Sequence, residues 1–157
     1  MRLAVLLLSV ASLAGCAGSE PAPVVPLTGS YESAHTISAL GADDWEDVDV
    51  TDRLAVIERG DSLDVSFTLL HTNYHICEWH GTMTREAEVW TARETLEYAD
   101  ESPECVLQLE VSADSLTLRD EDWVCRRAYC GVRGVIDGVG FRRDTRTADT
   151  SWRDELR

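Results

Sequence analysis

The sequence contains no lysine, so all 14 of its basic residues are arginine, against 29 aspartate and glutamate residues. The net charge of −15 argues against nucleic acid as a partner, because phosphate contacts need a basic face. No apolar run reaches the about 20 residues that a membrane-spanning helix needs. These absences exclude a nucleic-acid-binding protein and a helical membrane protein.

The motifs of common enzyme classes are also missing. The sequence has no G-x-S-x-G, no H-E-x-x-H, no P-loop and no dinucleotide-binding fingerprint. The glycines between Gly131 and Gly140 lie next to a hairpin signal, which indicates turn glycines. We therefore predict no catalytic residues, no cofactor and a protein that is not an enzyme.

The composition is that of a folded protein. The chain has 157 residues, of which 44% are hydrophobic and 27% are charged. This length is typical of one domain, and this balance is not that of a disordered chain.

The amino terminus has the pattern of a secretory signal. Arg2 is followed by an almost unbroken apolar run from Leu3 to Ala11, which is too short to span a bilayer. The small residues that follow end in Leu13-Ala14-Gly15-Cys16, which resembles the lipobox of bacterial lipoproteins. The resemblance covers residues 1–16 and implies removal of residues 1–15 and acylation of Cys16. The alternative is an ordinary secretory signal with a chance cysteine.

The same resemblance implies a location. Cys16 would carry three acyl chains, which anchor a protein firmly where one chain binds only marginally. Ala17 follows it, and in that family a residue other than aspartate there implies the outer membrane. We expect a lipid-anchored protein of the bacterial envelope, facing the periplasm or the cell surface, with the lipid bilayer as a partner.

Three of the four prolines lie between residues 21 and 26. Residues 16–28 are therefore predicted to be a lipidated, proline-rich tether. Residues 29–143 are predicted to be the folded domain. Residues 144–157 are predicted to be a polar tail, mobile in solution.

The folded domain is predicted to be all-β. Leu63, Val65, Phe67 and Leu69 alternate with polar residues, which is typical of a half-buried strand. The same alternation recurs over 74–84, 105–111 and 115–119, and weaker strand signals cover 29–37, 53–59 and 87–93.

The turns fit the same interpretation. Asp137-Gly138 predicts a hairpin between 135–136 and 139–141. Helical periodicity is weak, and short helices are predicted only near 39–45 or at the carboxyl end. We expect an antiparallel meander of about eight strands, as a closed or nearly closed barrel with Trp79 in its interior.

Four cysteines remain besides Cys16, and an even number in an exported domain predicts two disulfides. The pairing is open among three arrangements. We favour Cys77–Cys105, which joins two predicted inward-facing strand positions, and Cys125–Cys130, which closes a short local loop. The alternative is a redox or metal role, against which the absence of C-x-x-C argues.

Three histidines lie close to Cys77, namely His71, His75 and His80. Strand parity places His80 on the face opposite His75 and Cys77, so the ligands of a metal site would not converge. We predict no metal site and expect these histidines at the surface or at a pocket rim.

Acidic residues gather in one segment, with Asp43, Asp44, Glu46, Asp47 and Asp49 followed by Asp52. No glycine falls within this run, so an EF-hand calcium loop is excluded. The segment is either a solvated acidic loop or a patch that attracts a basic protein.

The arginines of a later segment stand out in an acidic chain. Arg126, Arg127 and Arg133 lie close together and form a candidate anion-binding corner. The alternative is that they offset nearby acids. Trp45 and Trp123 lie beside acids and are candidates for a barrel mouth or an interface.

Residues 75–142 resemble small uncharacterised envelope lipoproteins of a lipocalin-like or small-barrel kind. The resemblance rests on the segments Cys77-Glu78-Trp79-His80-Gly81, Cys105 to Leu109, and C-x4-C-G-x-R-G from Cys125 to Gly134. It implies a small barrel with two disulfides and carries no activity.

Size, anchor and acidity also resemble the membrane-bound lysozyme inhibitors, which are barrel lipoproteins that bind a basic enzyme. Their S-G-x-x-Y motif is absent, since this chain has Ser38-Ala39-Leu40-Gly41, so no inhibitor residues are carried over. Three functions remain: a non-catalytic binding or structural module of the envelope, which we favour; an inhibitor of a basic host lysozyme; and a carrier of a small apolar ligand.

Overall fold

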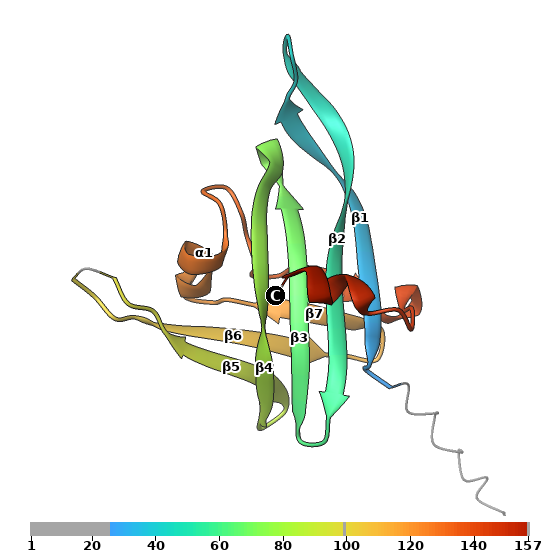
Figure 1. The fold of residues 1–157 in the computed structure, drawn as a ribbon, viewed down its shortest axis with the longest axis vertical. Coiled ribbons are helices and arrows are strands. Elements are labelled where there is room, and N and C mark those ends of the chain that lie inside the picture. Colours follow the sequence, from blue (N-terminus) through green and yellow to red (C-terminus); the bar gives the residue numbers. More distant parts are fainter. Residues whose placement is uncertain (1–25, 99, 157) are drawn as a thin grey trace, which may run out of the picture.

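The protein folds as one antiparallel sheet of eight strands in chain order, which confirms the all-β meander (Figure 1). The computed structural model describes residues 26–98 and 100–156. The predicted signal (1–15), the acylation site Cys16 and residues 16–25 of the predicted tether lie outside the described residues. The strands are β1 (Gly29–Leu40), β2 (Trp45–Arg59), β3 (Ser62–His71), β4 (His75–Glu86), β5 (Val89–Thr95), β6 (Glu104–Val111), β7 (Ser115–Arg119) and β8 (Gly140–Arg142).

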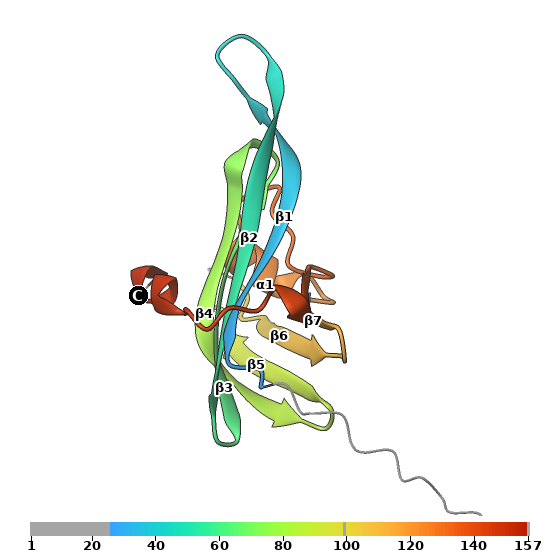
Figure 2. The same ribbon diagram turned by 90° about the vertical axis from the view of Figure 1, so that its right-hand side faces the viewer.

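The sheet bends into a nearly closed barrel with two layers. The long strands β1 to β4 run side by side, and β5, β6 and β7 cross behind them (Figure 1). Figure 2 shows these three strands on one side of the long ones. Among the described helices, none is long and apolar enough to cross a membrane.

The predicted alternation places the core side chains. Leu63, Val65, Phe67 and Leu69 are all fully buried, and they join one continuous cluster with inward-facing residues of the other strands. Trp79 lies in the interior as expected, stacked on Phe67 with ring centroids 6.0 Å apart. The barrel is therefore filled by its own side chains.

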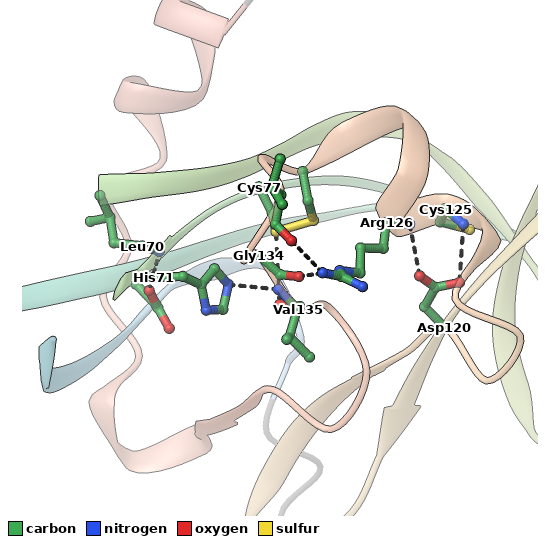
Figure 3. The surroundings of a disulfide bond; sticks show 11 residues. Leu70, His71, Cys77, Asp120, Cys125, Arg126, Gly134 and Val135 are labelled. Carbon is green, nitrogen blue, oxygen red and sulfur yellow. Dashed lines mark hydrogen bonds between the residues drawn. A yellow bond between two sulfur atoms is a disulfide. The ribbon is translucent and has the colours of Figure 1, made fainter. Parts of the chain in front are cut away.

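Between residues 120 and 134, the structure differs from the sequence prediction. Residues Val124–Tyr129 form a short helix, α1, where we predicted only a disulfide-closed loop. The buried Asp120 carboxylate accepts hydrogen bonds from the backbone N–H groups of Cys125 (3.1 Å) and Arg126 (2.8 Å), as Figure 3 shows. Because the first N–H groups of a helix lack internal partners, this carboxylate stabilises α1.

The favoured disulfide pairing is wrong. The structure joins Cys77 to Cys130 and Cys105 to Cys125. Both bonds lead to α1, so the helix is linked to β4 at one end and to β6 at the other. Side-chain parity correctly placed Cys77 and Cys105 inward, but it did not reveal that a helix lies between their strands.

Two further expectations differ from the structure. Residues 39–45 belong to the β1–β2 hairpin rather than to a helix. The turn at Asp137-Gly138 is present, but residues 135–136 are not a strand, and β8 pairs with β7 instead. The reason is that Ile136 is buried in the core, where it packs without sheet pairing.

The tail was predicted to be mobile, but its described part packs on the barrel. Ser30 and Thr147 exchange backbone hydrogen bonds of 2.9 and 2.8 Å, which brings the tail against the first strand. The Trp152 indole N–H donates to the Ser30 hydroxyl at 3.0 Å, and the side chain of Arg153 is buried. These contacts hold the carboxyl-terminal residues of the chain against β1 and so help to close the barrel.

Candidate interaction surface

The acidic segment forms the outer half of the β1–β2 hairpin. Pairing of β2 with β3 begins at Arg53, whereas pairing of β1 with β2 continues to Leu40 and Trp45. Beyond Arg53, β2 therefore pairs only with β1 among the described strands, and the outer part of this hairpin, residues 34–51, extends past the β2–β3 pairs to the loop at the top of Figures 1 and 2. We call these residues the arm.

The predicted acidic patch lies on this arm, and its carboxylates are solvent-exposed. The arm carboxylates are those of Asp43, Asp44, Glu46, Asp47 and Asp49. Asp47 accepts a hydrogen bond from the Ser38 hydroxyl (3.1 Å) and Asp49 from the Thr36 hydroxyl (3.0 Å), so cross-strand neighbours hold both on the outward face. Within the described residues, none of the arm carboxylates has an ion-pair partner.

Asp52, the sixth acid of the predicted patch, has a different role. Its side chain is buried at the base of the arm and accepts the backbone N–H of Leu70 at 2.7 Å. His35 Nε2 lies 3.1 Å from the same carboxylate oxygen. This acid links the arm to β3 and is not part of an exposed patch.

The neighbouring His71 forms a further hydrogen bond near Asp52, at the base of the arm. The Val135 N–H donates to His71 Nε2 at 3.2 Å (Figure 3). Burial lowers the pKa of His71 below its usual value, although the nearby Asp52 carboxylate opposes this shift. The imidazole is therefore favoured in its neutral form, which can accept that hydrogen bond.

Large apolar side chains are exposed around the arm. Five of the six exposed large hydrophobic residues of the described chain lie here: Leu40, Trp45, Tyr74, Ile76 and Val132. The exposed fractions range from 42% for Ile76 to 83% for Val132. Such clustering on an acidic protein is typical of a binding surface, whereas scattered apolar residues need no explanation.

Direct contacts connect the segments that carry these side chains. The Leu40 N–H donates to the Asn73 side chain at 3.1 Å, in the turn between β3 and β4. The Gly131 N–H donates to the Ile76 carbonyl at 2.9 Å. The Arg133 guanidinium lies 5.9 Å from the centre of the Trp45 ring. The arm, the β3–β4 turn and residues 131–133 therefore form one surface, which we call the arm surface.

The three arginines of the predicted anion-binding corner contact three different parts of the molecule. Arg126 donates to the carbonyls of Val132 and Gly134, which shapes the loop after α1 (Figure 3). Arg127 lies 3.7 Å from Glu101 and stacks over Tyr98. Arg133 stacks over Trp45. The corner thus contributes to the arm surface chiefly through Arg133, a connection that sequence spacing did not reveal.

The three histidines near Cys77 do not come together as one group. His71 and His75 face each other across the β3–β4 register, whereas His80 lies farther along β4. Among the described residues, no group of three or more metal-ligating side chains comes together.

A second feature lies beside His80. Two adjoining depressions between β4 and β5, of about 430 and 210 Å³, share Trp79, His80 and Glu94 in their linings. The Tyr129 hydroxyl from α1 donates to Glu94. Burial, together with this carboxylate, raises the pKa of Tyr129 well above its usual value, so the phenol stays protonated.

Sequence reasoning found Trp45 and the arm carboxylates but missed Leu40, Tyr74, Ile76 and Val132. Strand parity places Tyr74 and Ile76 on the outward face, so alternation could have found these two, whereas Leu40 and Val132 lie in segments for which no strand was predicted. Comparison with protein-family models, with curated proteins and with solved structures finds no match to this chain.

Proposed function

We propose that this protein is a lipid-anchored lipoprotein of the bacterial envelope, anchored through acylated Cys16 in the outer membrane, whose folded domain binds a basic protein through the arm surface without catalysing a reaction. The observation that carries this proposal is the arm, on which five exposed carboxylates, without ion pairs in the described part of the chain, adjoin exposed apolar side chains.

The path of the chain supports an arm that points away from the anchor. Leu27 and Thr28 donate their backbone N–H groups to Glu58, which fixes the start of the domain just before β1. The tip of the arm lies at the other end of β1, 12 residues farther along the chain. At about 3.3 Å per residue, this tip is about 40 Å from the point where the chain leads back to Cys16.

The chemistry of the arm surface supports a basic protein as the partner. Unpaired carboxylates attract cationic surfaces over a distance and speed association. Aromatic and aliphatic side chains at the centre of such a surface contribute most of the affinity once they are buried. The arm surface combines both features.

Inhibition of a basic host lysozyme is the second candidate. A narrow, projecting acidic hairpin is a shape that fits the cleft of a basic enzyme, which favours this alternative over a purely structural role. The carrier alternative receives no such support, because the barrel interior is occupied by fully buried side chains.

Titration with a basic protein tests the binding proposal. The full chain in detergent is titrated with lysozyme as the probe, by calorimetry at about 20 and about 200 mM salt. We expect binding that weakens at least tenfold at the higher salt, because screening reduces charge attraction. Neutralising all five arm carboxylates to Asn or Gln is expected to abolish it.

Unchanged binding after this neutralisation would contradict the arm as the contact surface. Lysozyme turnover measured on the same samples decides between the candidates: binding with unchanged turnover supports the binding module, and loss of turnover supports the inhibitor.

Anchoring has its own test. The mass of the amino-terminal peptide from the mature chain should equal that of a peptide beginning at Cys16 with attached acyl chains. Cys16→Ala should release the protein from membranes. An unmodified Cys16 in a protein that fractionates free of membranes would overturn the anchor.

A further inference from the structure

The nearly closed barrel has a split between β4 and β5. These strands pair only next to their shared turn, from Thr84↔Thr91 to Glu86↔Val89. Beyond these pairs the two strands diverge, as Figure 1 shows, although β4 continues to pair with β3 and β5 with β6. Each strand therefore has an edge that faces the gap.

On β4, the backbone of His80 points into this gap. In an antiparallel strand, the N–H and C=O groups of one residue share a side, and alternate residues face opposite sides. The Ile76 carbonyl accepts the Gly131 N–H on the side away from β3. His80, four residues later, has the same orientation, and no backbone bond within the described residues satisfies its groups on this side.

On β5, the same argument applies to Thr95. Thr91 faces β4, with which it pairs through Thr84. Thr95 lies four residues later and has the same orientation, toward the gap, where β4 no longer pairs with it. A segment inserted between the strands would therefore meet backbone donors and acceptors on both sides.

The edge of β4 already accepts one added segment. Cys130 forms an isolated antiparallel bridge with Cys77, and the bond from Gly131 to Ile76 accompanies it. This short stretch after α1 covers the start of the edge and ends before His80. The remainder of the edge borders the depressions of about 430 and 210 Å³.

The lining of this space determines which side chains would fit. Its inner wall includes Trp79, Cys105 and Leu107 of the core. Its outer rim includes the exposed carboxylates of Glu78 and Glu94. Alternate residues of an extended segment would thus meet an apolar wall and an acidic rim.

The only guanidinium among these lining residues is already engaged. Arg93 contacts Glu86 at 2.9 Å and Glu104 at 3.0 Å, so it does not neutralise the rim. The rim of the split therefore favours cationic side chains in a bound segment. The net charge of this protein, −15, also favours a cationic partner.

We propose that the split between β4 and β5 binds an extended peptide segment of a partner protein, in which basic residues alternate with apolar ones, and that this segment adds as a strand to the edge at His80. Main-chain hydrogen bonds would supply affinity and the alternating side chains selectivity. This site shares no residue with the arm surface, so either proposal can fail alone.

Binding of a designed peptide tests this inference. The probe is acetyl-Arg-Val-Arg-Val-Arg-Val-Arg-amide, titrated into the full chain in detergent. Its control carries N-methyl groups on all of its internal backbone amides, which keep the charge but remove the donors on both edges of the peptide. We expect at least tenfold weaker binding of the control and slower exchange of the His80 amide proton when the unmethylated peptide is bound.

Matched protein variants complete the test. His80→Pro removes the edge N–H, whereas His80→Ala keeps it, and proline is tolerated on strand edges. We expect at least tenfold weaker peptide binding for His80→Pro and little change for His80→Ala, and near-ultraviolet circular dichroism checks that both fold. Should His80→Pro misfold, the exchange of the His80 amide in the unaltered chain decides.

Equal binding of the methylated and unmethylated peptides, or unchanged exchange at His80, would overturn the proposal. Charge attraction would then be the sole cause of the binding. Protection of His80 that rises with protein concentration in the absence of peptide would also overturn it, because the occupant would then be a second copy of this chain. Neutralising the arm carboxylates should leave peptide affinity within about twofold.

Discussion

Several acidic residues on the strands β4 to β7 form ion pairs with arginine, whereas among the described residues those on the arm form none. On those strands, Arg93 pairs with Glu86 and Glu104, and Arg119 pairs with Glu110 at 2.9 Å. On the arm, none of the five carboxylates has an ion-pair partner among the described residues. Arginines thus pair with acids where these strands lie side by side, whereas the arm and, at the split, Glu78 and Glu94 have no ion pair among the described residues.

Buried acids sharpen this comparison. Asp120 accepts two backbone N–H groups of α1, and Asp52 accepts the N–H of Leu70. Both carboxylates satisfy groups that folding would otherwise leave unpaired. Acids in the body of the protein therefore contribute to stability, and we predict that those on the arm contribute to binding instead.

The largest expected effect concerns the covalent links of the body. Cys77–Cys130 spans 53 residues and Cys105–Cys125 spans 20. Loop-closure entropy predicts losses in the free energy of unfolding of about 4 and about 3 kcal/mol when each pair is changed to serine. Denaturant unfolding under non-reducing conditions measures both values. A smaller loss for the Cys77–Cys130 pair than for the other would contradict this order.

The next effect compares one buried acid with one arm acid. Asp120→Ala leaves the N–H groups of Cys125 and Arg126 without their acceptor, and we expect a loss of about 1–3 kcal/mol in the free energy of unfolding. Asp49→Ala, the matched control on the arm, should stay within about 0.5 kcal/mol. Equal losses for the two variants would break the distinction between body and arm.

A smaller effect depends on pH. The folded-state pKa of His71 is lowered by burial, so the unfolded chain binds a proton at higher pH than the folded chain does. Stability should therefore fall as pH decreases from about 7 through the unfolded pKa of about 6.5 toward the lower folded-state value. His71→Gln keeps an acceptor for the Val135 N–H and should flatten this dependence in thermal unfolding curves. An identical pH profile for the variant would argue against the buried, neutral imidazole.

The smallest effect concerns surface charge. Glu110→Gln removes the exposed pair with Arg119 and should lower the unfolding temperature slightly, because such pairs contribute little. Asp47→Asn on the arm should leave it unchanged or raise it slightly, since the arm carboxylates repel one another. Thermal unfolding at low salt gives both signs, and a clear loss for Asp47→Asn would contradict the comparison.

Much of the barrel could be predicted because alternation is a local property. The residues from Leu63 to Leu69 carry an uninterrupted apolar face, and β3 buries that face as expected. The segment from Cys105 to Val111 behaves in the same way. Where the pattern and the burial agree, one strand suffices to fix which side chains enter the core.

The remaining features depend on contacts between distant segments. The helix α1 is short, and its carboxylate partner, Asp120, lies outside the usual capping position, so no local signal predicts it. The disulfides follow from the place of this helix between β4 and β6. Trp45 meets Arg133 only because the chain after α1 returns to the arm. The acidic segment was visible in the sequence, but its projection as a hairpin was not.

The most direct test of the central claim compares two variants of equal charge. One neutralises the five arm carboxylates. The other neutralises five exposed acids elsewhere, namely Asp61, Asp100, Asp114, Glu121 and Asp122. The dissociation constant for lysozyme is measured for both at low salt. The account predicts at least a tenfold loss of affinity for the arm variant and less than a threefold loss for the other, whereas equal losses would show that net charge alone, and not the arm, determines binding.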